Sequence, residues 1–312
     1  MRSVTRDRDL GAAMSEGLDA LRPASPSTGA RWRTWPLVAE LAILGLILGG
    51  ALALRLVGIG NDTDLSDEGI RGIQLRLLAA GFRPVSEIYA SQGPLSLVMF
   101  APFYLLLGAD LTAARLASAL YGMVCLVAAF GLARALAGPP AALAATLLLG
   151  VSPVFLEGSR RAYVEVPSLA PAMVGLLLIF RWRGTGRPAW LVSSAALLAV
   201  GILAKPMAAV VGVAALVLVL AGPRPRASTG DGHTTPPRDG ARSWLLDLAV
   251  FGAAGLAVAA AVVLAIGPAA IWDQLIGYRV AARAARGWAL VENAGLIRSE
   301  LARDGAGLLA LA

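Results

Sequence analysis

The side chains best suited to acid–base chemistry are five carboxylates in one polar stretch, residues 59–93. They are Asp62, Asp64, Asp67, Glu68 and Glu87. The adjacent pair Asp67 and Glu68 is a candidate general base, because a carboxylate within reach of a hydroxyl can accept its proton. The chain has one cysteine, and its one histidine, His233, lies in a Gly/Thr/Pro stretch. This excludes a Cys/His metal site, an intrachain disulfide and a histidine-based triad, and leaves a carboxylate as the base.

A second set of charged residues is suited to holding a phosphate. Arg160 and Arg161 come just before Glu165, and Lys205, the only lysine among 27 basic residues, follows an apolar run and precedes a proline. Arginine and lysine bind phosphate through charge-assisted hydrogen bonds. A carboxylate base beside such cations at a lipid–water boundary suits a reaction on a lipid-linked phosphate donor.

Each of these residues also has a simpler interpretation. The simpler interpretation of Asp67 and Glu68 is that they are solvated charges in a loop. For Glu165 it is an acid stabilised by the dipole at the N-terminus of a helix. The two arginines suit lipid headgroups, and the lysine suits snorkelling to the membrane surface. No cofactor is expected, with a divalent ion bound through the oxygens of the three carboxylates as the alternative.

The elements that must position these side chains follow from composition. The chain is 57% hydrophobic and 15% charged, with a mean hydropathy of +0.71, whereas soluble domains have about 25% charged residues. In lipid every backbone polar group must be paired within the protein, so spans are helices or closed barrels. The apolar runs are unbroken and rich in Leu, Ala and Val, which excludes a barrel. The fold class is therefore all-α, a polytopic integral membrane helical bundle.

We expect about seven membrane spans, the first of which has the ~20 apolar residues that a bilayer requires. They are residues 36–58, 111–136, 141–155, 164–181, 189–204, 207–221 and 244–266. The apolar stretch 94–108 would give a helix of only about 22 Å, so we expect a juxtamembrane or re-entrant helix there. Residues 1–34 are expected to be a disordered basic arm and 35–266 the transmembrane domain. Residues 267–312 are expected to be an outer loop and the start of a further, truncated span.

The basic loops predict the orientation, because short cytoplasmic loops carry the excess of Lys and Arg. We expect a multi-pass protein of the plasma membrane. If residues 94–108 do not cross the membrane, its N-terminus and the basic loops 181–187 and 223–242 lie on the cytoplasmic side. The same rule explains the pI of about 10.4 without a nucleic-acid partner. This topology brings all the candidate residues to the outer face: Asp67, Glu68, Glu165, Arg160, Arg161 and Lys205.

The order of motifs resembles the GT-C membrane glycosyltransferases, in particular the protein O-mannosyltransferase and lipid A aminoarabinose transferase superfamily. The resemblance covers residues 64–220, about half of the chain, as an ordered set of segments. These segments are SDEGIRGIQLRLLAAG, YASQGPLSLVMFAPFYLLLG, LTAARLASALYGMVCLVAAFGLARALAG, LLLGVSPVFLEGSRRAYVEVPSLAPAMVGLLLIF and LLAVGILAKPMAAVV. Family members usually have more spans and often a soluble C-terminal domain, so the acceptor half of the site is one part that this chain could lack.

The resemblance implies transfer of a sugar from a polyprenyl-phosphate carrier, outside the cytoplasm, with inversion at the anomeric carbon. It makes Asp67 the catalytic carboxylate with Glu68 beside it, and Glu165 a second acidic position. Lys205 matches the lysine expected near the donor phosphate, and either Arg160 or Arg161 matches a basic position of the same loop. The expected partners are the carrier lipid, membrane lipids and an acceptor that is a glycan, a lipid or a protein.

A second class of function stays open, namely a non-catalytic transporter or an assembly scaffold for lipid-linked glycans. Charges inside membrane spans mark transport paths. The predicted spans have almost none at mid-depth, which favours chemistry at the membrane surface over an ion-coupled path.

Overall fold

The fold is seen in a computed structural model that describes residues 36–61, 67–90, 92–222 and 240–286, together with residues 295, 298 and 299. Across these ranges the secondary structure is helix and turn, with one isolated bridge between Pro84 and Ile88. The predicted N-terminal arm, His233 and the expected final span lie outside the described residues, as do Asp62 and Asp64.

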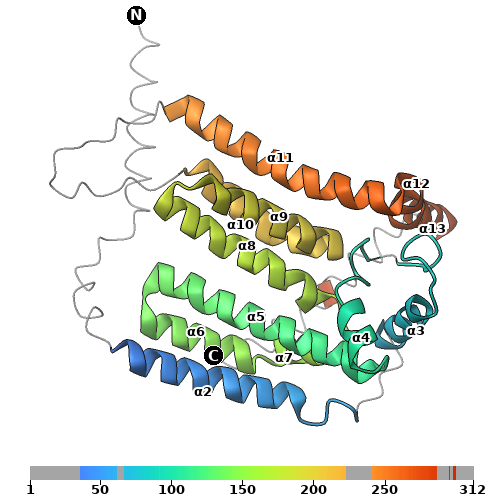
Figure 1. The fold of residues 1–312 in the computed structure, drawn as a ribbon, viewed down its shortest axis with the longest axis horizontal. Helices are drawn as coiled ribbons and strands as arrows, with labels where there is room; N and C mark the ends of the chain where they lie inside the picture. The colour runs from blue at the N-terminus through green and yellow to red at the C-terminus, as the bar shows by residue number, and fades with distance from the viewer. Residues whose placement is uncertain are drawn as a thin grey trace, which may run out of the picture.

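Each of the seven predicted apolar segments contains a helix, and these helices lie side by side (Figure 1). They are α2 (Leu37–Leu56), α5 (Leu111–Ala137), α6 (Pro139–Val151) with α7 (Pro153–Arg160), α8 (Glu165–Thr185), α9 (Pro188–Ala204), η2 (Pro206–Ala208) with α10 (Ala209–Leu220), and α11 (Gly240–Ile266). Leu and Val on the outward faces of α2 and α10 are exposed, as expected for a bundle whose solvent is lipid.

The number of full-length spans is smaller than the seven expected. By length and apolarity four described helices can cross a membrane: α2, α5, α8 and residues 244–266 of α11. A fifth is obtained if α6 and α7, which are bent by 63° at their junction, count as one span. The other two segments, α9 and residues 206–220, are apolar but shorter. The predicted segments are therefore helical, but not all of them are as long as a full membrane span.

The bend between α6 and α7 has a local cause in the sequence. Pro153 has no backbone N–H and starts a new helix after Ser152, so carbonyls of the last turn of α6 lose their helical donors. Arg55, buried at the end of α2, donates from Nη1 to the carbonyl of Gly150 at 3.3 Å and to that of Ala51 at 2.8 Å. The buried arginine thus satisfies a carbonyl that the bend exposes.

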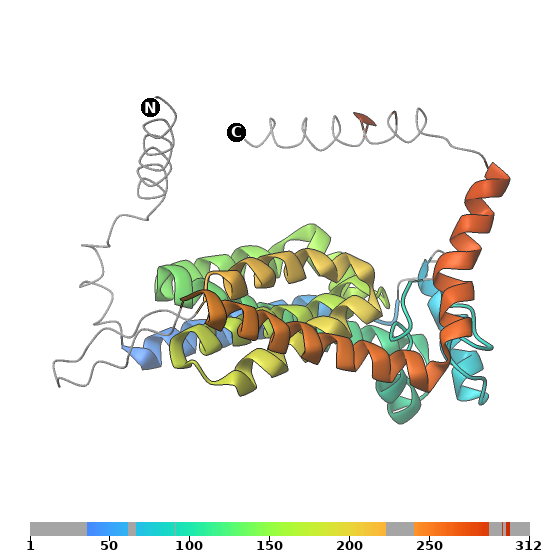
Figure 2. The ribbon, with the colours of Figure 1, turned by 90° about the horizontal axis from the view of Figure 1, so that it is seen from above.

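Five short helices gather at one end of the bundle, on the right in Figure 1. They are α3 (Asp67–Ala79), α4 (Ala101–Leu107), α12 (Pro268–Trp272), the π-helix η3 (Asp273–Gly277) and α13 (Tyr278–Arg286). Figure 2 shows α13 beside α3, turned away from the long helices. The predicted helix 94–108 is thus a run of turns over 94–100 followed by α4 alone, and it stays at this end without crossing.

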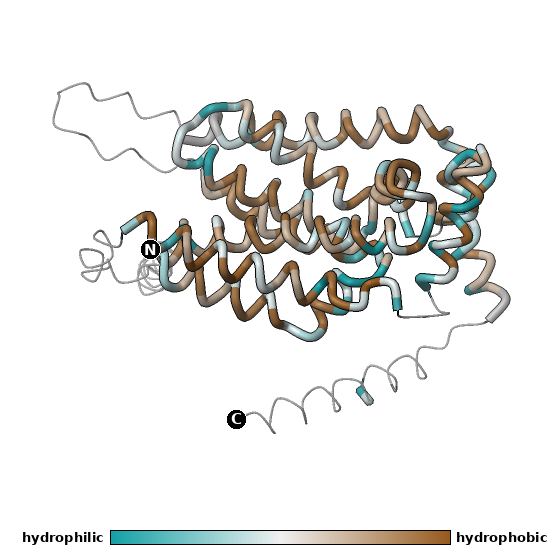
Figure 3. Tube along the Cα trace, turned by 60° about the horizontal axis from the view of Figure 1, so that its bottom comes forward, coloured by the Kyte–Doolittle hydropathy of each residue, from teal (hydrophilic) through white to brown (hydrophobic). Residues whose placement is uncertain are grey.

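Hydrophilic residues concentrate at the ends of the helices and hydrophobic residues in their middles (Figure 3). Because 94–108 does not cross, the turns α7–α8 and α9–α10 lie at the same end as α3. A buried apolar cluster fills the space beneath that end and joins α3, the loop 84–100, the start of α5 and the end of α9. Its most buried members include Leu75, Ile88, Leu97 and Phe100. Burial of this apolar surface is what holds the polar loops of this end in one arrangement.

Candidate active site

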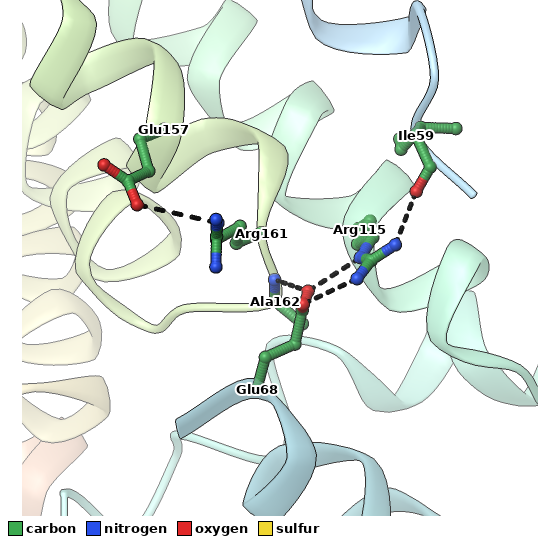
Figure 4. Close-up of polar contacts among 6 residues, drawn as sticks. All are labelled: Ile59, Glu68, Arg115, Glu157, Arg161 and Ala162. Carbon is green, nitrogen blue, oxygen red and sulfur yellow. Dashed lines mark hydrogen bonds and ion pairs between the residues drawn. The ribbon is translucent and has the colours of Figure 1, made fainter. Parts of the chain in front are cut away.

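Glu68 is the best-anchored of the predicted site residues. Its carboxylate is fully buried and accepts Arg115 Nε at Oε1 (2.8 Å) and Arg115 Nη2 at Oε2 (2.7 Å). The backbone N–H of Ala162 also donates to Oε1, at 2.8 Å, and Arg115 Nη1 donates to the carbonyl of Ile59 at 2.7 Å (Figure 4). This bidentate pair ties α3 to the start of α5 and to the turn before α8. With both oxygens engaged, Glu68 is placed to position its neighbours.

Asp67, one residue earlier, is exposed at the first position of α3. Consecutive helical residues point in different directions, so the anchored Glu68 leaves Asp67 facing elsewhere. Asp67 lines a pocket of about 160 Å³. The other lining residues are Ile70, Arg71, Gln74, Tyr89, Ala90 and Gln92. The exposed carboxylate of the predicted pair therefore lies in the wall of a small pocket that also contains the polar side chains of Arg71, Gln74 and Gln92.

Arg71, which lies one helical turn after Asp67, brings a buried cation to this pocket. It is 4% exposed, and it donates from Nη1 to Gln74 Oε1 at 2.8 Å and from Nη2 to Gln92 Oε1 at 3.1 Å. Among the residues that the structure describes, its Nε has no hydrogen-bond partner. Burial lowers the pKa of the Arg71 guanidinium to about 10, while the charges of Glu165 and Asp67 act in the opposite direction. The group stays protonated at neutral pH and lies within electrostatic reach of both carboxylates.

Glu165 and Lys205 form a direct ion pair. Glu165 is the first residue of α8 and Lys205 follows the last residue of α9, and the lysine Nζ donates to Glu165 Oε1. Both side chains are partly buried, at 35% and 19% exposure. Since Glu165 also acts on Arg71, the pair and the Asp67 pocket belong to one cluster of alternating charge.

A glycine allows the segment that follows Gln92, residues 92–95 (the pocket loop), to contact the end of α9. The N–H of Leu95 donates to the carbonyl of Leu203 at 3.1 Å. A Cβ on Gly93 would lie 2.4 Å from the same oxygen and 2.5 Å from the carbonyl oxygen of Ala204. Only glycine fits this approach, which fixes Gln92 and the pocket next to Lys205.

The two predicted arginines of the α7–α8 turn lie at the same end but outside the set of residues that line the pocket. Arg160 donates from Nη2 to the carbonyl of Val57 at 2.7 Å, linking α7 to the end of α2. Arg161 Nε lies 3.6 Å from Glu157 Oε1 (Figure 4), and its guanidinium is 5.9 Å from the ring centroid of Tyr163. Both come just before Ala162, whose N–H donates to Glu68, so their described contacts hold the turn.

Sequence reasoning missed Arg71, Arg115 and the two glutamines that accept from Arg71. A signal for Arg71 was present, because an acid and an arginine four residues apart on a helix face each other. Arg115 was hidden inside a predicted span. Among the described residues no group of three or more His, Cys, Asp or Glu side chains converges as a metal site would require.

Comparisons with known proteins agree with the architecture. Residues 91–231 match the family described as dolichyl-phosphate-mannose-protein mannosyltransferase. The fold is similar to the crystal structure of ArnT from Cupriavidus metallidurans in the apo state, with a TM-score of 0.54 and 19% identity. That similarity covers 76% of this chain and 44% of ArnT, so the chain spans less than half the length of that structure. No curated protein matches the chain.

Proposed function

We propose that this chain, a member of the GT-C superfamily of membrane glycosyltransferases, transfers a sugar from a polyprenyl-phosphate carrier to an acceptor hydroxyl at the outer face of the membrane. The matched family segment and the shared fold support the superfamily. The observation that carries the chemistry is the cluster of Asp67, Arg71, Glu165 and Lys205 at one end of the apolar bundle.

Asp67 acts as the general base. The acceptor hydroxyl attacks the anomeric carbon of the donor sugar, and Asp67 takes the hydroxyl proton as the new C–O bond forms. The bond between that carbon and the phosphate oxygen breaks on the opposite side, and its electron pair leaves with the phosphate. A single displacement of this kind inverts the anomeric carbon. Asp67 suits the role because it is exposed in the pocket, whereas both oxygens of Glu68 are occupied.

Arg71 and Lys205 stabilise the negative charge that builds on the departing phosphate. Arg71 is suited to this because its buried Nε lacks a partner among the described residues and because its hydrogen bonds to Gln74 and Gln92 go to neutral amide side chains. Glu165 holds the ammonium group of Lys205 in place. Arg160 and Arg161 support the site from outside the pocket by holding the turn that carries Ala162.

The carrier chain fits an apolar groove of about 420 Å³ between α9, α10 and α11. Leu203 and Ala209, which line it, flank Lys205 in the sequence. A prenyl chain in this groove would place its phosphate at the cationic end and stay in the membrane after transfer. The acceptor hydroxyl in this proposal belongs to a glycan, a lipid or a protein.

The test is replacement of Asp67 by asparagine in the chain reconstituted in proteoliposomes, with polyprenyl-phosphate-linked hexoses and pentoses as donors. We expect the Asp67→Asn variant to lose transfer by at least about 100-fold, the usual contribution of a positioned base. Asp273→Asn is the matched control, because Asp273 is an exposed carboxylate at the same end outside the pocket lining. Undiminished transfer by Asp67→Asn would remove the base. Carrier binding by the unaltered chain without transfer of any of these sugars would favour a scaffold and overturn the proposal.

A further inference from the structure

One wall of the Asp67 pocket is a tight loop with a strained backbone, residues 83–90. Tyr89 and Ala90 of this loop line the pocket. The N–H groups of Glu87 and Ile88 both donate to the carbonyl of Arg83, at 3.1 Å each. Val85 is buried and has a φ of +68°, which is rare for a β-branched residue. Such a conformation persists only where the surroundings enforce it.

A glutamine from the far end of the chain contacts this loop at three backbone groups. Gln274 Nε2 donates to the carbonyl of Val85 and, at 3.5 Å, to that of Ile88, while its Oε1 accepts the N–H of Ala90 at 2.7 Å. Gln274 lies in the π-helix η3, a form that is rare and often found at functional sites.

Two further contacts hold the same loop. On the α3 side, Gln74 Nε2 donates to the carbonyl of Tyr89, and Gln74 is also one of the two glutamines that accept from Arg71. On the η3 side, the ring of Tyr278 meets the ring of Tyr89 edge to face, with centroids 5.1 Å apart. The segment after α11 (η3 and α13) and the helix α3 therefore contact the same loop from two sides. Figures 1 and 2 show these elements close together.

We propose that Gln274 is a positioning residue that shapes the sugar-donor pocket through the 83–90 loop, a role that rests on the proposed function. Gln274 is not among the residues that line the pocket, so it acts through Tyr89 and Ala90. Removing its amide leaves the carbonyl of Val85 and the N–H of Ala90 without these partners, and buried backbone groups without partners are strongly disfavoured. The strain at Val85 then relaxes, and the wall next to Asp67 moves.

The first test measures the contact itself by hydrogen–deuterium exchange on the full chain in lipid nanodiscs. In Gln274→Ala we expect amide exchange over residues 84–90 to rise about tenfold, as the loss of a buried hydrogen bond predicts. Gln274→Glu keeps an oxygen for Ala90 but loses the donor to Val85, so its exchange should be intermediate. Val280→Ala, which shortens an exposed side chain of α13, should leave exchange unchanged. Unchanged exchange in Gln274→Ala would overturn the proposal.

The second test separates positioning from general structure. With every lining side chain still present, Gln274→Ala should raise the KM for the sugar donor about tenfold and lower kcat less, while Gln274→Glu recovers part of the loss. Raised exchange over 84–90 with an unaltered donor KM would show that the loop does not shape the pocket, and would also overturn the role. The proposed function fails if the Asp67→Asn variant still transfers sugar. The role of Gln274 fails on amide exchange or on the donor KM, so the two failures are distinguishable.

Discussion

The two ends of the helical bundle are built in different ways. At the end opposite the pocket, α5 passes to α6 through Gly138 alone and α8 passes to α9 through two residues. At the pocket end, α2 and α5 are separated by residues 57–110, which include α3, α4 and the pocket loop. Since turns this short suffice to return a helix into the membrane, reversal of the chain alone does not require a connection as long as residues 57–110.

The ion pairs of the two ends differ in the same way. Arg134 at the end of α5 pairs with Glu40 at the start of α2, and the arginine is 48% exposed. Glu68 and Arg115 at the pocket end are 0% and 3% exposed. A buried pair adds little net stability over apolar packing of the same shape, so its presence at one end indicates a requirement for placement. What it places is the start of α3, and therefore Asp67.

The largest expected effect is on transfer, from removal of the buried cation. Arg71→Met should lower sugar transfer by about 100-fold or more, because under the proposed function it removes a charge that stabilises the leaving phosphate. Arg134→Met should leave transfer within about twofold, because Arg134 lies at the opposite end of the bundle and pairs there with Glu40. The rates are measured with the two proteins in the same proteoliposomes. Equal losses in both variants would mean that the two ends do not differ in function.

The next largest effect is on stability. Glu68→Gln should lower the free energy of unfolding by about 3–5 kcal/mol, because Arg115 then remains as an uncompensated buried charge. Glu40→Gln should cost about 1 kcal/mol or less, since its partner reaches solvent. Unfolding in detergent reports both. The double change Glu68→Gln with Arg115→Met should be milder than Glu68→Gln alone, and a simple sum of two losses would contradict an ion-pair origin.

A third prediction separates strain from position by comparing two glycines. Gly93→Ala should cost about 1–3 kcal/mol, the usual cost of overpacking, and lower transfer about tenfold, because its Cβ would push the pocket loop from α9. Gly186→Ala, at the opposite end with a φ of +68°, should cost about 1–2 kcal/mol of backbone strain and leave transfer intact. Thermal unfolding and transfer rates are compared, and lost transfer in Gly186→Ala would remove the distinction.

The smallest effect concerns an exposed pair within the pocket end itself. Glu157→Gln should change stability by less than about 1 kcal/mol, because Glu157 is 60% exposed and lies 3.6 Å from Arg161. The measurement is the midpoint of thermal unfolding, with Glu68→Gln in the same series. A loss as large as that of Glu68→Gln would show that burial is not what separates the two pairs.

Much of the architecture could be predicted because membrane helices follow from length and composition. The seven apolar segments all contain helices, and the basic loops predicted that residues 94–108 stay at one end. Counting membrane crossings from this assignment placed Glu165 and Lys205 at the same membrane face, and the two side chains are paired in the structure. The length of each span was less predictable, since a proline such as Pro153 can begin a new helix or bend an existing one.

The sequence could not predict that Glu68 is buried in an ion pair while the adjacent Asp67 is exposed in the pocket. It depends on Arg115, 47 residues from Glu68, and on which face of α3 packs against α5. No sequence pattern marks Arg71 as buried, because its burial comes from packing beside Phe100 and the pocket loop. Gln274 carries no charge and fits no motif, so only its proximity to the 83–90 loop in three dimensions reveals it.

The polar cluster is assembled from the first and last residues of helices, with Glu165 opening α8 and Lys205 following α9. The middles of those helices then have to meet only two demands, a sufficient length and a lipid-compatible surface. Many exchanges among Leu, Ala, Val and Ile satisfy both. Sequence change can therefore accumulate along the membrane-buried length without loss of the arrangement at the tips, in keeping with a fold that is similar to that of ArnT at 19% identity.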